Sequence, residues 1–349
     1  MKRFSILIAA LCLCLTGCGK QTTEATAQIF AMDTVMEVAA YGEHAEQAVK
    51  YTEKRIEELE NRLSRTKADS LVSGLNRDGS IRHLTYDYWN LIARAKEYRD
   101  ATNGAFDITI APVMDAWGFT GDSFRVPEQS ELDTLLKKVN SDAIQMLGSP
   151  SDSVTLGEGQ AIDLGGIAKG YTSDCVEAVF YDHEIENGKI SLGGNVFVLG
   201  TKPDGSDWRV GIKDPRNESG LAAILSLRDA YAITSGGYER YFEENGKTYH
   251  HIIDPATGYP ADSGLLSVTV VAADNGPDWA GAGNGAMCDA FSTALFVMGE
   301  EQALDFWRNG GYDFDLVLVT EDGRVVITAG LADRFEEVKD SGYTYETVS

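Results

Sequence analysis

The sequence is short of cysteine, proline and basic residues for a chain of 349 residues. Its 5 cysteines and 8 prolines exclude a disulfide-stapled scaffold and a collagen-like or proline-rich chain. Beyond the first eighteen residues only Cys175 and Cys288 remain, and neither belongs to a Cys-x-x-Cys or cysteine–histidine spacing that would suit zinc. We interpret both as buried, unreactive thiols, with a disulfide between them as the alternative.

Basic residues are scarce beside acidic ones. The chain has 30 lysines and arginines against 54 acidic residues, which gives a formal net charge of −24. This balance argues against a nucleic-acid-binding protein, whose affinity depends on neutralising phosphates, and against electrostatic docking on an anionic membrane. A phosphate-bearing ligand would need a bound cation to compensate its charge. The hydrophobic fraction of 43% is enough for a packed core, which excludes a mainly disordered chain.

The first eighteen residues have the pattern of a bacterial lipoprotein signal. Lys2 and Arg3 precede an apolar run over residues 4–15 that is too short to span a bilayer, and the run ends in Leu-Thr-Gly before Cys18. We predict that residues 1–17 are a signal peptide and that Cys18 is the lipidated mature N-terminus. The protein would then be extracytoplasmic and lipid-anchored to the bacterial cell membrane. An ordinary signal peptide with a chance cysteine is the alternative.

The rest of the chain is predicted to be a short tether and one domain. Residues 18–28 are mostly polar and without apolar periodicity, which is typical of a tether, and residues 29–349 are assigned to the domain. No Pro/Gly/Ser-rich linker divides this domain. Long helical patterns mixed with hairpin signals favour an α+β fold over a doubly wound sheet.

Hydrophobic periodicity predicts the main elements. Residues 34–41 are predicted to form a strand, and apolar positions recur at helical spacing over about 43–63 and 86–102. From residue 189 onward the pattern becomes one of strands. Hairpin turns are predicted at Asn245-Gly246 and Asp322-Gly323, a short helix after Pro127, and further helices over 286–298 and 300–309.

Two glycine-rich segments could form turns at a ligand. Asp163 ends a strand-like run, Gly165 and Gly166 follow, and a helix begins near Lys169, so that backbone N–H groups and one cation could receive an anion. A tight turn without a ligand is the alternative. The second segment, residues 191–195, reads more simply as a structural turn or bulge.

Two further segments carry candidate chemistry. Asp289 and Thr293 are four residues apart and share one helix face, which offers a carboxylate and a hydroxyl to Mg²⁺ or Ca²⁺. The alternative is an aspartate near a helix start and a threonine bonded to the backbone. His250 and His251 are adjacent, so in a strand one would face a site and the other solvent. A purely structural histidine is the alternative.

Seven segments, in this order along the chain, resemble those of a known protein family. They are FDITIAPVMDAWGF, DLGGIAKGY, SLGGN, WRVGIKDP, AITSGGYERYF, HIIDPATGYP and DAFSTALFVMG. Together they resemble the ApbE-type FAD:protein FMN transferases, over nearly the whole chain after the signal. The resemblance implies an ApbE-like, T-fold-related α+β fold, a single domain of two intertwined α/β halves with mixed or antiparallel sheets. It also implies that FAD is bound with Mg²⁺, and that FMN is transferred to a Thr or Ser hydroxyl of a protein acceptor with release of AMP.

The resemblance also implies which residues form the site. Flavin and adenine contacts fall on a set spread along the chain: Met32, Thr66, Ala105, Phe106, Asp107, Asp163, Lys169 and Ile253. The metal ligands would be the Gly166 carbonyl, Asp289 and Thr293, with Ser292 as a further contributor. The family position of Thr66 is often aromatic, and the segment 274–287 is longer than usual before the metal aspartate.

This chemistry needs no internal nucleophile, because the acceptor supplies the hydroxyl. A base could remove the hydroxyl proton, and His251 is our candidate, with Asp289 in its metal-bound environment as the rival. If His251 is the base, activity should fall as the pH drops through about 6.5, where an unperturbed imidazole is protonated. Two alternatives remain: a Mg²⁺-dependent FAD pyrophosphatase that uses water and gives FMN and AMP, and a non-catalytic FAD-binding lipoprotein.

Overall fold

The computed structural model describes residues 23–121, 123–147, 153–276 and 283–349. The predicted signal peptide, Cys18 and part of the 274–287 segment lie outside the described residues. Within the described part of the chain, no helix is both long enough and apolar enough to cross a membrane.

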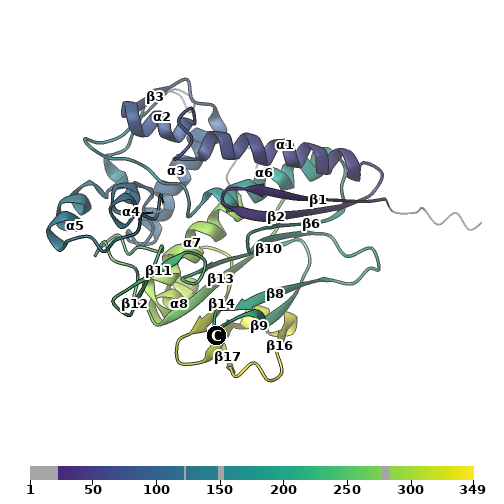
Figure 1. Cartoon of the computed structure of the whole chain (residues 1–349). Helices are drawn as coiled ribbons and strands as arrows, with labels where there is room; N and C mark the ends of the chain where they lie inside the picture. Colours follow the sequence, from purple (N-terminus) through teal and green to yellow (C-terminus); the bar gives the residue numbers. More distant parts are fainter. Residues whose placement is uncertain (1–22, 122, 148–152, 277–282) are drawn as a thin grey trace, which may run out of the picture.

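A large central sheet organises the molecule, and nine strands form it among the described residues (Figure 1). Neighbouring strands are antiparallel except for the last pair, which is parallel, so the sheet is mixed. In spatial order the strands are β1 (Glu24–Ala31), β2 (Thr34–Tyr41), β6 (Asn187–Leu192), β7 (Asn195–Leu199), β10 (Ala230–Gly236), β13 (Leu265–Ala273), β14 (Asp315–Thr320), β15 (Arg324–Thr328) and β17 (Thr344–Val348).

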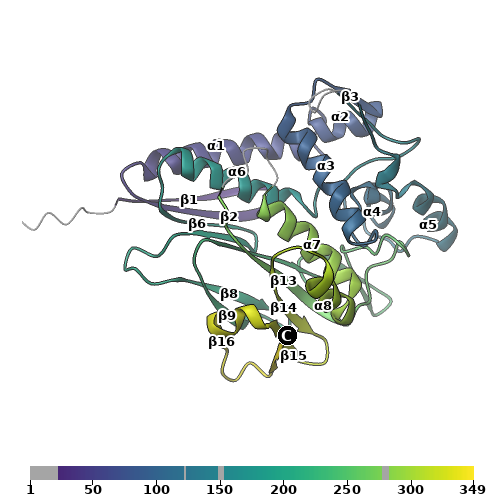
Figure 2. The same ribbon diagram turned by 180° about the vertical axis from the view of Figure 1, so that it is seen from behind.

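Helices cover one face of this sheet and a small second sheet covers part of the other (Figures 1 and 2). The largest buried cluster fills the helical side, and a second cluster fills the space between the two sheets. The covering helices are α1 (Ala45–Leu63), α6 (Ala168–Asp182), α7 (Asn284–Met298) and α8 (Glu300–Asn309). The small sheet has the order β16 (Phe335–Glu337), β9 (Asn217–Leu227) and β8 (Trp208–Asp214).

The remaining elements gather at one end of the molecule, where Figure 1 shows α2 to α5 beside the ends of α1 and α7. The elements are α2 (Leu71–Asp78), β3 (Ser80–Arg82), α3 (Tyr86–Ala101), α4 (Ala111–Trp117), α5 (Gln129–Leu135), β4 (Gln145–Leu147), β5 (Ser153–Thr155), β11 (Tyr241–Glu244) and β12 (Lys247–His250). A third buried cluster around Trp117 joins α4, α5 and the β11–β12 hairpin, while α2, α3 and the strands β3 to β5 pack in the main cluster. The Trp117 indole donates to the Gly258 carbonyl at 2.7 Å.

The architecture confirms the α+β class with mixed sheets in a single domain, since the large sheet takes strands from both ends of the described chain. The predicted strand over 34–41 and the hairpin turns at 245–246 and 322–323 are also confirmed. Each predicted helix is present, with bounds that differ by no more than two residues where we gave them.

The predicted tether is wrong over residues 24–28, which form the first part of β1. This strand pairs with β2 along its whole length, from Glu24 opposite Tyr41 to Ala31 opposite Thr34. Ala25 and Ala27 alternate with polar residues and pack against the main core. Alanine contributes too little hydrophobicity for this alternation to stand out in the sequence, and the pairing with β2 stabilises the strand.

Candidate functional site

A cavity of about 530 Å³ opens between the β1–β2 hairpin, the start of α6 and the helix α7. This volume is in the range of small-molecule sites. The structure brings every residue of our predicted flavin, metal and base sets except Ser292 to the lining of this one cavity: Met32, Thr66, Ala105, Phe106, Asp107, Asp163, Gly166, Lys169, His251, Ile253, Asp289 and Thr293. Their placement is thus established, while the role of each stays a prediction.

The start of α6 holds the carboxylate of Asp289. Gly170 N–H donates to Asp289 Oδ2 at 2.8 Å, and the Asn195 side-chain amide donates to Oδ1 at 3.2 Å. Burial raises the pKa of Asp289, while the Lys169 charge and these donors oppose that shift. The arrangement supports an anion at a helix N-terminus and leaves lone pairs on both carboxylate oxygens for a cation.

The oxygens near Asp289 suit Mg²⁺. Among the described residues no group of three or more His, Cys, Asp and Glu side chains is placed to hold a metal ion, so a cation here would rely on hydroxyl and carbonyl oxygens as well. Thr293 lies one helical turn beyond Asp289 on α7, and a Cβ built on Gly166 would lie 3.3 Å from Thr293 Oγ1. The Asp289 carboxylate and the Thr293 hydroxyl, with the Gly166 carbonyl as a third candidate ligand, would form a hard oxygen set that leaves room for phosphate or water ligands.

Ser292 does not line the cavity, which argues against the contribution that we predicted for it. Its hydroxyl lies 2.8 Å from Ser235 Oγ and bonds the backbone carbonyl of Asp289 at 2.9 Å. Ser235 on β10 does line the cavity and lies 3.2 Å from Thr293 Oγ1. Ser292 therefore fixes α7 against β10 rather than pointing into the site.

Asp163 closes the glycine turn and binds an arginine from a distant segment. Its Oδ1 accepts from Gly165 N–H at 2.7 Å, and its Oδ2 accepts from Arg65 at 3.0 Å. Arg65 also binds Asp115 at 2.8 Å and is largely buried. The conformation of the turn is thus fixed by the hydrogen bonds of Asp163 to Gly165 and Arg65. Thr66, next to Arg65, is exposed and lines the cavity.

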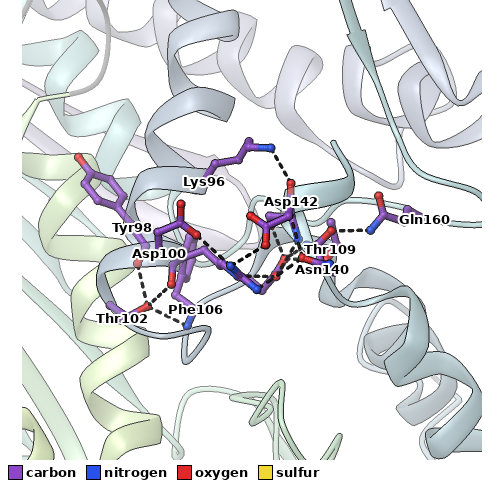
Figure 3. A network of polar contacts seen from close by, with 12 residues as sticks. Lys96, Tyr98, Asp100, Thr102, Phe106, Thr109, Asn140, Asp142 and Gln160 are labelled. Atoms are coloured by element: carbon purple, nitrogen blue, oxygen red, sulfur yellow. Dashed lines mark hydrogen bonds and ion pairs between the residues drawn. The ribbon is translucent and has the colours of Figure 1, made fainter. Parts of the chain in front are cut away.

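Asp107 is buried, and its carboxylate is fully engaged by the protein itself. It accepts from the backbone and hydroxyl of Thr109 and from the backbone of Ser141, at 2.6 to 3.0 Å. Figure 3 shows the surrounding network, in which Phe106 and Thr109 lie between the end of α3 and the turn that contains Asn140 and Asp142. A flavin contact at Asp107 would therefore use its backbone, and the network holds the Phe106 ring beside Gly166.

The β1–β2 hairpin has a strained turn that lines the cavity. Its two turn residues, Met32 and Asp33, have φ values of 50° and 59°, a region that residues other than glycine rarely adopt. The Met32 sulfur lies 3.8 Å from the Thr172 hydroxyl on α6, and Glu60 accepts from the Met32 N–H at 3.4 Å. Such strain persists only when its surroundings hold it, and it clusters at functional sites.

The two histidines have different environments. His250 is satisfied by the chain, since one ring nitrogen lies 3.0 Å from the Ala261 carbonyl and the other accepts from Ile252 N–H, and its ring packs on Phe296. His251 lines the cavity, and its Nδ1 lies 3.1 Å from the Arg240 carbonyl. The prediction that one of the two histidines faces solvent is therefore wrong for His250, which contacts protein on both ring nitrogens.

His251 has the tautomer that a base requires. Because a carbonyl only accepts, the neutral ring carries its proton on Nδ1, and the Nε2 lone pair is left for a ligand. Burial lowers the pKa of His251 to about 4, with smaller contributions from the charges of Arg240 and Lys169. The expected midpoint near pH 6.5 is therefore wrong for this histidine, which stays neutral and able to accept a proton well below neutral pH.

The cations of the cavity differ in how they are held. Arg240 donates to the Phe119 carbonyl at 3.0 Å and pairs with Asp33 at 3.2 Å, and Lys67 pairs with Glu60 at 3.1 Å. In the part of the chain that the structure describes, the Lys169 ammonium has no such partner, although it lies close enough to act on Asp289 and His251. Lys169 is thus the cation most available to a phosphate.

Sequence reasoning missed three residues that shape the site, namely Arg65, Asn195 and Arg240. Each acts on a residue far away in the sequence: Arg65 on Asp163, Asn195 on Asp289 and Arg240 on Asp33. Asn195 has a local signal, because a buried amide after the Gly193–Gly194 turn needs a partner. The two arginines have none that the sequence alone provides.

Comparison with known proteins agrees with this geometry. The model of the ApbE family matches residues 32–316. The chain belongs to the ApbE family. Curated ApbE relatives include FAD:protein FMN transferases from Treponema pallidum, 30% identical over 83% of this chain and 82% of the relative, and from Klebsiella pneumoniae, 33% identical over 82% and 86%.

Solved ApbE structures have the same fold. The ApbE protein of Thermotoga maritima is 30% identical, with a TM-score of 0.77 over 91% of this chain and 97% of that chain. The flavinyl transferase ApbE of Pseudomonas stutzeri, in its apo form, is 25% identical, with a TM-score of 0.74 over 91% and 95%. The α+β fold predicted from the motifs is therefore that of the family.

Proposed function

We propose that this protein is a Mg²⁺-dependent flavin transferase that moves FMN from FAD onto a Thr or Ser hydroxyl of a protein acceptor and releases AMP. The observation that carries the proposal is the convergence, in one cavity, of Asp289, Thr293 and Gly166 with the neutral His251 and with Lys169, whose ammonium has no ion pair among the described residues. Family membership supports the same activity, because its curated relatives are named FAD:protein FMN transferases.

The cavity would bind FAD through complementary parts. Phe106 and Ile253 offer apolar surface to the ring systems, and Met32 and Ala105 add further apolar contacts. Lys169 and the start of α6 face the pyrophosphate, whose two negative charges need positive partners in a chain of net charge −24. Mg²⁺ held by Asp289, Thr293 and the Gly166 carbonyl would supply positive charge to the phosphate oxygens.

The reaction exchanges the phosphoanhydride bond of FAD for a phosphoester bond to the acceptor. The acceptor hydroxyl oxygen bonds to the FMN-side phosphorus of FAD, the bond from that phosphorus to the bridging oxygen breaks, and AMP leaves with the bridging oxygen. His251 Nε2 takes the hydroxyl proton. Lys169 stabilises the charge that develops on the phosphoryl oxygens, and the cavity holds the reacting groups in line.

The test uses the purified chain with FAD, MgCl₂ and an acceptor protein that normally carries phosphoester-linked FMN on threonine, prepared without its flavin. We expect in-gel flavin fluorescence on the acceptor and one AMP per FMN transferred. AMP and free FMN without labelled acceptor would identify a FAD pyrophosphatase. Binding of FAD without either product would identify a flavin-binding protein, and both results would refute the transferase. Chelation of Mg²⁺ with EDTA is the matched control.

The same proposal places the enzyme outside the cytoplasm, anchored through a lipid on Cys18. The support is the basic start, the short apolar run and the Leu-Thr-Gly-Cys sequence of residues 15–18. Acceptor proteins would then be those exposed on the same side of the membrane. Acyl labelling of the expressed full chain, with Cys18→Ala as control, tests the anchor.

A further inference from the structure

Large exposed apolar side chains gather beside the opening of the cavity. Phe30 is 74% exposed and Val35 57% exposed, and they are cross-strand partners at the end of the β1–β2 hairpin. Tyr241 is 50% exposed and Phe124 41% exposed, next to the β11–β12 hairpin. We call these four residues the apolar rim.

The two halves of the apolar rim belong to one opening. Asp33 lies in the turn between Phe30 and Val35, and Arg240 directly precedes Tyr241. Both Asp33 and Arg240 line the cavity and are exposed, and they form an ion pair at 3.2 Å. Arg240 also bonds the carbonyl of Phe119, whose ring contacts the Phe124 ring at 5.7 Å between centroids.

The hairpin half of the rim lies close to the predicted reacting centre. Its turn residue Met32 contacts Thr172 on the first turns of α6, the helix whose N-terminal Gly170 holds Asp289. Thr34, directly after the turn, packs against Gly193 so closely that a Cβ on this glycine would overlap the Thr34 side chain. Gly193 lies two residues before Asn195, which binds Asp289. The hairpin that carries Phe30 and Val35 therefore reaches the cavity through its turn residues Met32, Asp33 and Thr34, near Asp289 and the start of α6.

The composition of the rim indicates a polypeptide partner. Exposed Phe, Tyr and Arg are the residues enriched at the centres of protein interfaces. Exposed carboxylates at Asp33 and Glu239 lie between the two apolar pairs, and the chain has a net charge of −24, so an anionic membrane surface would be repelled. A segment that is not itself acidic and that has apolar side chains fits this pattern of charge and hydrophobicity.

The geometry points to the apolar rim as the docking surface of the acceptor protein. The acceptor lays a segment with apolar side chains on both sides of its Thr or Ser across Phe30, Val35, Tyr241 and Phe124, and this segment presents the hydroxyl to the cavity between them. The inference rests on the proposed transferase activity, because only a protein substrate needs a surface outside the cavity. It adds that recognition of the acceptor is separate from recognition of FAD.

The experiment measures steady-state FMN transfer by the full chain to the same flavin-free acceptor, with saturating FAD and MgCl₂. In the double variant Phe30→Ser/Val35→Ser we expect the KM for acceptor to rise at least tenfold while the Kd for FAD stays within about twofold. Leu147→Ser is the matched control, since Leu147 is also 57% exposed but lies in the separate β3–β5–β4 sheet, and its KM should not change.

A second variant keeps the test valid if the hairpin change impairs folding, which thermal unfolding would report. Tyr241→Ser, on the other half of the rim, should also raise the KM for acceptor without a change in FAD affinity. An unchanged KM for acceptor in both rim variants overturns the inference. The inference is also overturned if the rim variants keep the wild-type KM for acceptor but lose binding to phosphatidylcholine vesicles, or lose a dimer that the wild type forms in sedimentation. If the wild-type chain labels no acceptor, it is the transferase proposal that fails.

Discussion

The base assignment of His251 makes a quantitative prediction about pH. With a pKa of about 4, His251 would be about 90% neutral at pH 5, whereas an imidazole with a pKa of 6.5 would be only about 3% neutral there. Transfer by a neutral base should therefore keep roughly nine-tenths of its plateau rate at pH 5. The rate should then fall with a midpoint near pH 4, because protonation occupies the Nε2 lone pair that accepts the hydroxyl proton.

The assay is single-turnover FMN transfer from bound FAD between pH 4 and 9, with FAD binding measured at every pH. His251→Ala should lower the rate by about 10²–10⁴-fold at pH 7 with little change in FAD affinity, and it should lose the acid limb near pH 4. An acid limb that persists in His251→Ala would belong to Asp289, whose pKa burial also raises. A wild-type rate that falls to half near pH 6.5, or weakened FAD binding with unchanged turnover in the variant, would refute the base assignment.

The remaining predictions concern the metal site, the helix crossing and the anchor. Asp289→Ala should lower FMN transfer by at least about 10³-fold while FAD binding weakens less, and full activity of this variant in EDTA-treated buffer would contradict the metal assignment. Gly170→Ala should lower the free energy of unfolding by about 3 kcal/mol, because its Cβ would overlap the Gly285 carbonyl and lie 2.6 Å from Asp289 Cβ; urea unfolding checks this. The control Gly74→Ala, with its nearest contact at 3.8 Å, should be neutral or stabilising, and equal midpoints for the two variants would contradict the packing argument. Cys18→Ala should release the protein from membranes or leave the signal uncut, and a variant that still carries a labelled acyl chain would exclude lipidation at this residue.

His251 also contributes to the pH dependence of the free energy of unfolding. The folded chain keeps His251 neutral down to a pKa of about 4, whereas the unfolded chain protonates it near 6.5. Between these values His251 binds more protons in the unfolded state, so its contribution to the free energy of unfolding falls as the pH drops from 6.5 to about 4. Burial raises the pKa of Asp174 to about 7 and that of Glu177 to about 9, and these two carboxyls contribute in the opposite sense. The measurement is therefore the difference between wild type and His251→Ala: the free energy of unfolding of the wild type should fall relative to that of the variant over this range.

Local patterns predicted the elements that carry their own amphipathic signal. Helix α1 shows buried residues at mostly three- and four-residue steps from Ala45 to Leu63, and β2 before it is a short, largely apolar run in which Met36 and Val38 are buried. Strand β1 has the same geometry but uses alanine on its inner face, so its signal is weak, and it exists because β2 provides a partner along its whole length. The strand thus depends on its pairing with the strand that follows the Met32–Asp33 turn, and not on a periodicity of its own.

The residues of the candidate site also separate into those with a local sequence signal and those without one. Glycine turns and the Asp289/Thr293 spacing are local, and they led to the cavity lining. Arg65 lies 98 residues from Asp163, and Asn195 lies 94 residues from Asp289, so their contacts depend on the assembled fold. The pKa of His251 could not be predicted from the sequence either, because the largest cause of its shift is burial of the ring by the assembled fold.

The crossing of α6 and α7 has a consequence for how the family can vary. Each helix supplies the carboxylate that binds the other's N-terminus: Asp289 of α7 accepts from Gly170, and Asp174 of α6 accepts from the N–H groups of Gly285 and Ala286 at 2.7 and 2.9 Å. A change at one end therefore removes a partner from both helices at once. The two helices are more than a hundred residues apart in the sequence, but each depends on the carboxylate of the other. Substitutions at these contact positions should therefore occur in pairs or not at all. Transplanting Asp289 into another scaffold would require both helices and their glycine contact, because α7 alone would lack the Gly170 N–H and the Lys169 charge that act on this carboxylate.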